Sequence, residues 1–359
     1  MSDKYNDFMD FLLEETMKNK GTDLHLCAGS KPLMRVNSVL KEVDGTEKLT
    51  PDVIVNFVED YLGDENLAVL KKNKSIDFSY SKRNLGRFRC NVYYQRGTYA
   101  MAIRALPIEI PEFDTLKLPD IIKTFTEKTK GLVLVTGATG SGKSTTLASM
   151  IDLINQKHKY HIITIEDPLE YLHRHKNSMV TQREIGEDAL DFSTSLKAAL
   201  REDPDVIMVG EMRDMETISI ALTAAETGHL VLSTLHTSSA VKAIDRMVDA
   251  FSMEQQNQVR SQLATVLEGV ISQQLVPQKD GGGMRAVTEV MIANTAVRNL
   301  IREGKHYQIN NLIQSGSKIG MVSMERNLAE LAKADIISHE QGSIRSSDPT
   351  IFENYMKQR

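Results

Sequence analysis

The stretch LVLVTGATGSGKSTTLASMI, from Leu132 to Ile151, decides the fold of the larger part of this chain. It begins with an apolar run, continues through a glycine-rich turn and ends in a segment with helical spacing. The turn matches GxxxxGK[ST], in which glycines let backbone N–H groups converge on phosphate oxygens at a helix N-terminus. The stretch therefore predicts a strand, a phosphate-binding loop and a helix, in that order.

Two side chains of the loop are expected to contact what it binds. Lys143 is expected to reach the β- and γ-phosphates, and the hydroxyl of Ser144 is expected to bind Mg²⁺. The predicted phosphate-binding residues cover the whole motif: Gly137, Ala138, Thr139, Gly140, Ser141, Gly142, Lys143, Ser144 and Thr145.

Acidic residues follow two other apolar runs. In DVIMVGEMRD (205–214), Glu211 is expected at the carboxyl end of a strand neighbouring the loop, where ligands of parallel sheets bind. We expect it to hold Mg²⁺ partly through water. HIITIEDPLEYLH (161–173) ends in three acids, and hydrolysis needs a carboxylate to orient or deprotonate water. The residues alone leave the choice among Glu166, Asp167 and Glu170 open.

Histidines occur in two places in the same region. His229 and His236 lie at the two ends of one short expected strand, about 23 Å apart, so they cannot share a metal. Ordinary strand-end histidines are the simpler interpretation, and a sensor of nucleotide state is the alternative. His173 and His175 are expected in a solvated loop, because no third ligand has metal-site spacing.

Two arginines lie in a region that has no phosphate loop. Arg89 and Arg104 belong to SIDFSYSKRNLGRFRCNVYYQRGTYAMAIRAL (75–106), whose alternation around two turns predicts an antiparallel meander. A solvated strand face is the simpler interpretation. The alternative is that these arginines neutralise charge on a transferred γ-phosphoryl group from outside.

Composition narrows the class of protein. A chain of 359 residues is long enough for two domains, and its net charge of −5 argues against a dedicated nucleic-acid binder. Two cysteines without a CxxC pair fit a reducing compartment. We find no secretory signal and no apolar run near the roughly 18 residues of a membrane span. The expected location is therefore cytoplasmic, with membrane contact only through partners.

The order of strand and helix patterns predicts two domains. Residues 1–107 are expected to form an α+β domain, and the proline-rich residues 108–120 a linker. In residues 121–359, apolar strands alternate with helices, which predicts an α/β fold with a mostly parallel sheet covered on both faces. From about residue 245 we expect mainly helices, interrupted by one hairpin that turns at Gly281–Gly283.

The order of the motifs resembles that of a known superfamily. GATGSGKST, ITIEDPLE, VGEMRD and TGHLVLSTLHT are similar to the Walker A, Asp box, Walker B and His box of the secretion ATPases of type II secretion and type IV pili. AVRNLIREGK (296–305) resembles a motif of the pilus retraction motors within that superfamily, although an ordinary amphipathic helix is an equal alternative. The chain also shows no tetracysteine segment or long N-terminal extension of the kind found in extension motors.

The resemblance implies a fold and roles that spacing alone leaves open. It implies an N-terminal PAS-like domain and a RecA-like ATPase domain that binds ATP and Mg²⁺. Glu170 then activates water, and Glu211 is the Walker B glutamate. His229 and His236 connect the nucleotide site to subunit contacts. The remaining pair, Arg89 and Arg104, reaches the nucleotide of a neighbouring subunit.

The resemblance also implies an assembly and a task. The expected protein is a homohexamer at the inner face of the cytoplasmic membrane, where ATP hydrolysis drives pilus retraction through an inner-membrane platform protein and other pilus machinery. Alternatives are an accessory retraction ATPase and an extension or type II secretion ATPase. A nucleic-acid translocase and a nucleotide-binding scaffold are alternatives of a different class.

Overall fold

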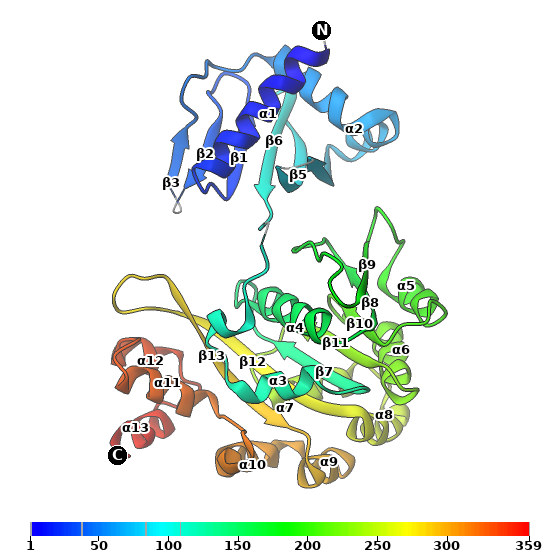
Figure 1. Ribbon diagram of the computed structural model, residues 1–359, viewed down its shortest axis with the longest axis vertical. Helices are drawn as coiled ribbons and strands as arrows, with labels where there is room; N and C mark the ends of the chain where they lie inside the picture. The colour runs from blue at the N-terminus through cyan, green and yellow to red at the C-terminus, as the bar shows by residue number, and fades with distance from the viewer. Residues whose placement is uncertain (1, 37–38, 83–84, 108, 359) are drawn as a thin grey trace. The chain divides into compact units, whose positions relative to one another are not determined.

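The chain divides into two compact units. The computed structural model describes residues 2–36, 39–82, 85–107 and 109–358. One unit comprises Met1–Glu109 and the other Ile110–Arg359 (Figure 1). Each unit is described by itself below.

The first unit is an antiparallel sheet with two helices. Its strand order is β3-β2-β1-β6-β5-β4, and the helix α2 begins after Thr50, whose side chain accepts a hydrogen bond from the backbone N–H of Val53. Pro51 at the first turn is compatible with a helix start because its missing N–H has no partner there. The elements are α1 (Ser2–Lys18), β1 (Asp23–Cys27), β2 (Leu33–Val36), β3 (Val39–Glu42), α2 (Pro51–Asn73), β4 (Ser75–Lys82), β5 (Gly86–Gln95) and β6 (Thr98–Ala105).

The two faces of this sheet differ in polarity. Leu24 and Leu26 of β1 are buried in a core that includes Phe57 of α2. The alternate positions are polar, and in them Asp23 pairs with Arg104, which in turn pairs with Arg89 across β1, β6 and β5. The predicted meander of β4, β5 and β6 is confirmed, and its two arginines are direct cross-strand neighbours.

The second unit contains a seven-stranded sheet. Its order is β13-β12-β7-β11-β10-β8-β9, and every neighbouring pair is parallel except β12 with β13. The mostly parallel sheet predicted from the sequence is confirmed. The strands are β7 (Gly131–Thr136), β8 (His161–Glu166), β9 (Met179–Glu184), β10 (Val206–Val209), β11 (Leu230–Leu235), β12 (Leu267–Pro277) and β13 (Met284–Ile292).

Alternate residues of β7 show how both faces of this sheet are covered. Val133 and Val135 pack in one core with the helix α4, whereas Leu132 and Leu134 pack in another with helices of the opposite face. The first face carries η1 (Phe113–Leu116), η2 (Asp120–Ile122), α3 (Lys123–Thr126) and α4 (Lys143–Lys157). The second carries α5 (Phe192–Ala199), α6 (Met215–Glu226), α7 (Ala240–Asp249), α8 (Met253–Val266), α9 (Thr295–Arg302) and α10 (Ile309–Ser315).

The C-terminal region is largely helical, as expected, but its hairpin belongs to the sheet. The strand β12 pairs with β7 along the strand that precedes the phosphate loop, and β13 continues the sheet. Helices of the C-terminus pack on Val276 and Val287 of this hairpin. These helices are α11 (Met324–Lys333), α12 (His339–Arg345) and α13 (Pro349–Lys357), preceded by η3 (His306–Gln308) and η4 (Gly316–Ile319). Among the described residues, no helix is both long and apolar enough to span a membrane.

Two sequence expectations differ from this arrangement. The proline-rich residues 108–120, expected as a linker, include Phe113 and Leu118, which are buried in the core beside α4. Their apolar side chains explain why residues from 110 onward pack with the second unit. In addition, β11 lies between β7 and β10, so Glu211 is two strands away from the phosphate loop rather than on its neighbour.

The helix α9, which contains most of the AVRNLIREGK segment, is anchored in the second unit. Val297 and Ile301 are buried, and the guanidinium of Arg298 donates to the backbone oxygens of Ala264 and Thr265 at the end of α8. A further bond of 2.8 Å joins Arg298 to Glu268. One face of this segment therefore has a structural role.

Gly269 of β12 offers a test of how tightly the sheet packs. A Cβ at this position would lie 2.2 Å from the ring of Phe125 and 2.9 Å from the backbone oxygen of Met291. Alanine normally stabilises a strand interior relative to glycine, but here the steric overlap destabilises the protein by more than that gain. We expect Gly269→Ala to lower the free energy of unfolding by about 1–3 kcal/mol, measured by denaturant titration.

Gly282→Ala is the matched control. Its Cβ would meet only the carboxylate of Asp280 in the exposed hairpin turn, so its effect should stay within about 0.5 kcal/mol. Equal effects of the two variants would contradict the packing argument.

Candidate functional site

The predicted phosphate loop connects β7 to α4. Gly142 has φ of 87° and Gly137 has φ of 150°, backbone conformations that side chains with a Cβ rarely adopt. The ammonium of Lys143 donates to the backbone oxygens of Gly137 and Ala138, at 3.0 Å each. Burial lowers the pKa of Lys143, and the carboxylates of Glu211 and Glu170 oppose this effect. The structure thus confirms the strand, loop and helix predicted from the opening stretch.

The strand β12 supports this loop from behind. The side chain of Gln273 donates to the backbone oxygen of Ser141 at 2.8 Å and accepts from the hydroxyl of Thr146 at 2.8 Å. A Cβ at Gly137 would lie 2.3 Å from the backbone oxygen of Gln273. The glycine pattern therefore reflects the close approach of β12 as well as phosphate binding.

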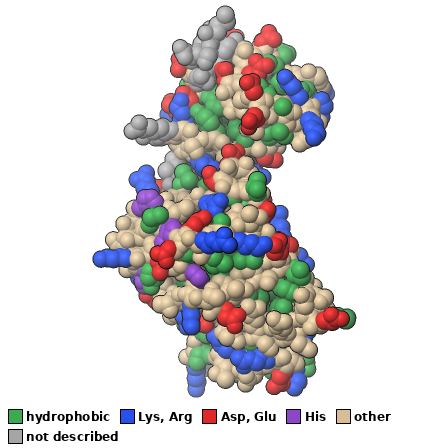
Figure 2. All heavy atoms as spheres, turned by 90° about the vertical axis from the view of Figure 1, so that its right-hand side faces the viewer, with side chains coloured by type: hydrophobic (Ala, Val, Ile, Leu, Met, Phe, Trp, Pro, Cys, Tyr) green, Lys and Arg blue, Asp and Glu red, His purple; other side chains and the backbone are tan. Residues whose placement is uncertain are grey.

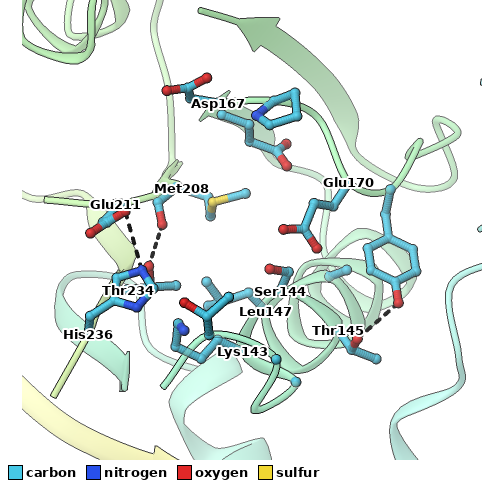
Figure 3. Close-up of a pocket in the computed structure, with 18 of the residues that line it drawn as sticks. Lys143, Ser144, Thr145, Leu147, Asp167, Glu170, Met208, Glu211, Thr234 and His236 are labelled. Atoms are coloured by element: carbon cyan, nitrogen blue, oxygen red, sulfur yellow. Dashed lines mark hydrogen bonds and ion pairs between the residues drawn. The ribbon is translucent and has the colours of Figure 1, made fainter. Parts of the chain in front are cut away.

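A cavity of about 550 Å³ opens in front of the loop. Acidic and basic side chains face it from the carboxyl ends of β8, β10 and β11 (Figure 3). Its lining includes Thr139, Gly140, Gly142, Lys143, Ser144, Thr145, Glu166, Asp167, Glu170, Tyr171, His173, Glu211, Arg213 and His236. The structure thus brings most of the predicted loop residues and both predicted catalytic glutamates together in one cavity.

The three acids after β8 have different surroundings. The carboxylate of Glu166 is buried and accepts from Thr164 Oγ1 at 2.6 Å and Gln182 Nε2 at 3.2 Å. Burial raises its pKa to about 7. Glu170 is exposed, and Figure 3 shows its carboxylate pointing into the cavity toward Ser144, whereas that of Asp167 points away. Geometry therefore separates three acids that the sequence left equivalent.

Glu211 lies at the end of β10 among cationic and aromatic groups. Arg213 contacts its Oε2 through Nε at 2.8 Å and through an η nitrogen at 2.7 Å. The imidazole Nε2 of His236 lies 3.4 Å from the same oxygen. The second of these contacts links the predicted Walker B glutamate to one histidine of the predicted His box.

Three other predicted site residues are not among those that line this cavity. His229 precedes β11 at the opposite edge of the sheet, where its Nδ1 lies 3.0 Å from the backbone oxygen of Ala224. Arg89 and Arg104 belong to the first unit, where they approach Asp77 at 3.8 Å and Asp23 at 2.9 Å. Within the second unit, His229 is thus at the end of β11 opposite the cavity, and the two arginines belong to the other unit.

The sequence did not point to several residues that shape the site. The hydroxyl of Tyr171 lies 2.9 Å from that of Thr145, so the segment after β8 touches the phosphate-loop helix. His173, expected in a solvated loop, lines the cavity, and burial lowers its pKa to about 4. Its partner in that expectation, His175, is exposed. The strand β9 (179–184), whose sequence MVTQRE alternates only weakly, places Gln182 beside Glu166.

The loop fits the phosphates of a nucleotide. The buried hydroxyl of Ser141 has no hydrogen-bond partner within the described part of the chain, as expected where a ligand supplies one. No group of three His, Cys, Asp or Glu side chains among the described residues is arranged to hold a metal ion. A cation here would therefore need phosphate oxygens as ligands, as Mg²⁺ commonly has.

Comparison with known proteins assigns the family. Residues 102–326 match the family described as type II/IV secretion system protein. The chain belongs to this family. It is 43% identical over 341 residues to the type IV pilus retraction ATPase PilT of Pseudomonas aeruginosa, covering 95% of this chain and 98% of PilT. It is 44% identical over 317 residues to the twitching motility protein of Neisseria gonorrhoeae, covering 88% of this chain and 84% of that protein.

A solved structure agrees with this assignment. The crystal structure of the pilus retraction motor PilT with bound ADP matches this secretion-family chain with a TM-score of 0.89 and 48% identity. The match covers 96% of this chain and 99% of that one. Together these likenesses identify the chain as a nucleotide-binding ATPase of the type II/IV secretion system family.

Glu166 provides a test of the buried carboxyl beside the cavity. Since its pKa rises from 4.5 to about 7 on folding, its contribution to stability is complete below about pH 4.5 and is lost as pH rises through about 7. In the wild type this loss lowers the free energy of unfolding by up to about 3 kcal/mol between about pH 4.5 and about pH 7. We expect Glu166→Gln to lack this decrease. Urea titrations across the range measure it.

Exposed Glu187→Gln is the control and should keep the wild-type pH dependence. Glu289, whose burial also raises its pKa to about 7, contributes a similar dependence that both variants retain. Parallel curves for wild type and Glu166→Gln would contradict the assignment.

Proposed function

We propose that this chain is a hexameric motor that hydrolyses ATP to retract type IV pili. The observation that carries the proposal is the position of Glu170, whose carboxylate faces Ser144 across a cavity built on a complete phosphate loop (Figure 3). The likeness to PilT over nearly the whole chain supports retraction as the task. The two units would then act as an N-terminal domain and an ATPase domain.

The nucleotide would bind through residues of α4 and the loop before it. Lys143 would leave its contacts with the backbone oxygens of the loop to bind the β- and γ-phosphates, and Ser144 and Glu211 would hold Mg²⁺, the latter partly through water. The ion would neutralise phosphate charge as it develops in the transition state. A second cavity of about 370 Å³ shares Gly142 and Thr145 with the first and offers room for the nucleoside.

Glu170 is the best candidate for the group that activates water. Glu166 is buried and already bound by Thr164 and Gln182, and its pKa of about 7 keeps it largely protonated below neutrality. Asp167 points away from the cavity in Figure 3. Glu170 is therefore free to accept the proton of a water that attacks the γ-phosphorus, after which ADP and phosphate leave.

Arg89 and Arg104 would complete the site of a neighbouring subunit. They are adjacent on the polar face of the first unit, so one surface could present both guanidinium groups to a transferred phosphoryl group. Loss of the γ-phosphate would remove these contacts and favour a more open arrangement of the two units. His236, beside Glu211, would report the nucleotide state, and β11 would connect it to His229.

The motor would act through membrane-bound partners. We propose a peripheral position at the inner face of the cytoplasmic membrane, where the ring engages a platform protein of the pilus machinery. An accessory retraction ATPase, an extension motor and a type II secretion ATPase remain the alternatives within the family.

A nucleic-acid translocase is the alternative of another class. On the face shown in Figure 2, Lys and Arg side chains are interspersed with Asp and Glu, whereas nucleic-acid motors present a basic stripe. ATPase activity that rises with added DNA or RNA would favour this alternative. A non-catalytic nucleotide-binding scaffold would show no turnover at all.

Glu170→Gln tests the proposed chemistry. The amide cannot accept the proton of water, so we expect turnover to fall by at least about 100-fold while ATP affinity changes less than about twofold. Phosphate release and fluorescent-nucleotide titration measure the two quantities. Asp167→Asn is the control and should retain turnover. A Glu170→Gln protein with normal turnover would exclude Glu170 as the base.

The same Glu170→Gln variant, placed in the host chromosome, tests the direction of the motor. Retraction predicts retained or excess pili together with lost twitching. Cells without pili would instead identify an extension motor.

Mixing two inactive variants tests the arginines. Arg89→Ala keeps its own Glu170, and Glu170→Gln keeps its own arginines, so an interface between the two variants is complete. We expect ATPase activity to rise above that of either variant when they are co-assembled. A mixture of Arg89→Ala with Arg104→Ala is the control, because neither subunit presents both arginines. If ATPase activity does not rise in the first mixture, or rises equally in both mixtures, the arginines do not act across subunits.

A further inference from the structure

The segment that carries Glu170 is an irregular excursion between two strands. It leaves β8 after Glu166 and returns at Met179, the start of β9. Glu170 itself is exposed, so its place relative to the phosphate loop depends on how the flanking residues are held. Hydrogen bonds to two side-chain amides hold them.

Gln182 of β9 binds the first half of this segment. Its Nε2 donates to the backbone oxygen of Tyr171 at 2.9 Å and to Glu166 Oε1 at 3.2 Å. Its Oε1 accepts from the backbone N–H of His173 at 2.7 Å. The amide of Gln182 therefore uses both of its N–H donors and its oxygen to bind the eight residues from Glu166 to His173, which include Glu170.

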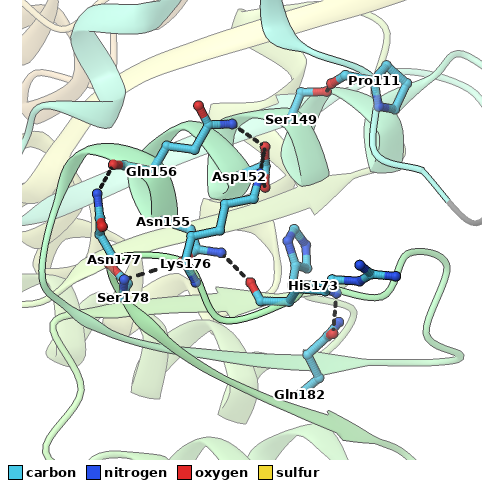
Figure 4. Close-up of polar contacts among 11 residues, drawn as sticks. Pro111, Ser149, Asp152, Asn155, Gln156, His173, Lys176, Asn177, Ser178 and Gln182 are labelled. Carbon is cyan, nitrogen blue, oxygen red and sulfur yellow. Dashed lines mark hydrogen bonds and ion pairs between the residues drawn. The ribbon is translucent and has the colours of Figure 1, made fainter.

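Asn155 of α4 binds the second half (Figure 4). Its Nδ2 donates to the backbone oxygen of Arg174 at 2.7 Å, and its Oδ1 accepts from the backbone N–H groups of Lys176 and Ser178 at 3.1 and 3.3 Å. The side chain is fully buried. Nearby, the ammonium of Lys176 forms an ion pair of 2.7 Å with the buried Asp152 of the same helix.

Gln182 ties the segment to β9 and to the end of β8, and Asn155 ties it to the helix that begins at the phosphate loop. Asn155 and Asp152 lie on α4, which starts at Lys143, and the Thr145–Tyr171 contact joins the same helix to the middle of the segment. The position of Glu170 is thereby fixed relative to the helix that presents Ser144. A base whose segment is tied to the element that presents the phosphate site can keep a fixed separation from that site.

We propose that Gln182, together with Asn155, is a positioning residue for the carboxylate of Glu170, holding the segment between β8 and β9 at a fixed distance from the phosphate loop. The inference rests on the proposed role of Glu170. Neither amide is required to contact the nucleotide. A shift of the base by about 1 Å is enough to reduce an enzymatic rate on the order of 100-fold.

Gln182→Leu is the direct test. It removes all three hydrogen bonds with little change in volume, so we expect kcat to fall about 10- to 100-fold. ATP affinity should stay within about twofold, because Lys143 and Ser144 keep their places. Arg183→Gln, on the next residue of β9, is the matched control and should retain kcat. Full kcat in Gln182→Leu would overturn the proposal, as would equal losses of kcat and ATP affinity.

Gln182→Glu adds a readout that a general loss of stability would not move. The new carboxyl faces that of Glu166, whose pKa is already raised to about 7, and the two can share a proton only at lower pH. We expect the ratio of variant to wild-type kcat to fall as pH rises from about 6 to about 8. If the ratio of variant to wild-type kcat does not depend on pH, the Gln182–Glu166 contact has no part in positioning Glu170. Asn155→Asp, which keeps the acceptor and loses the donor to Arg174, should lower kcat less than Gln182→Leu.

A double variant separates this inference from the proposed function. If Gln182 acts through Glu170, then Gln182→Leu should not lower the residual turnover of Glu170→Gln any further. An additive loss would overturn the positioning role. If Glu170→Gln retains turnover, the proposed function of Glu170 fails, whereas an inactive Glu170→Gln beside a fully active Gln182→Leu refutes only the positioning role.

Discussion

The contact between β12 and the phosphate loop is the constraint on which the second unit depends. The amide of Gln273 binds Ser141 in the loop and Thr146 in the first turn of α4, and its backbone oxygen occupies the space that a side chain at Gly137 would need. The loop can keep its backbone N–H groups directed at a phosphate only while this strand supports it. Residues more than 120 positions later in the sequence thus help to determine the shape of the phosphate loop, although its sequence motif is contiguous.

Parallel strands extend this constraint to the remaining site. Because β7, β11, β10 and β8 run in one direction, their carboxyl ends bring Lys143, His236, Glu211 and Glu170 to one edge. The helix α4 then acts as a common frame, since its first turn faces the phosphate site and its fourth turn binds the segment after β8. Burial supplies the chemical differences, as the contrast between Glu166 and the exposed Glu170 illustrates.

The sequence predicted local features well and the distant contacts poorly. The strand–loop–helix around Lys143 and the meander of β4 to β6 follow from short-range patterns, and the structure confirms them. The strand β9 was missed because its alternation is weak and half polar. The place of β12 beside β7 was missed because pairing between strands far apart leaves no periodic signal. For the same reason, the sequence could not reveal Gln273, Gln182 or Asn155 as supports of the site.

The two ends of β11 have a mechanical consequence. This strand is hydrogen-bonded to β7 on one side and to β10 on the other, with His236 following it at the cavity and His229 preceding it at the far edge. An extended chain clamped on both sides can neither stretch nor buckle appreciably. A displacement at the His236 end can therefore reach the His229 end only by moving β11 and the strands paired with it as one body.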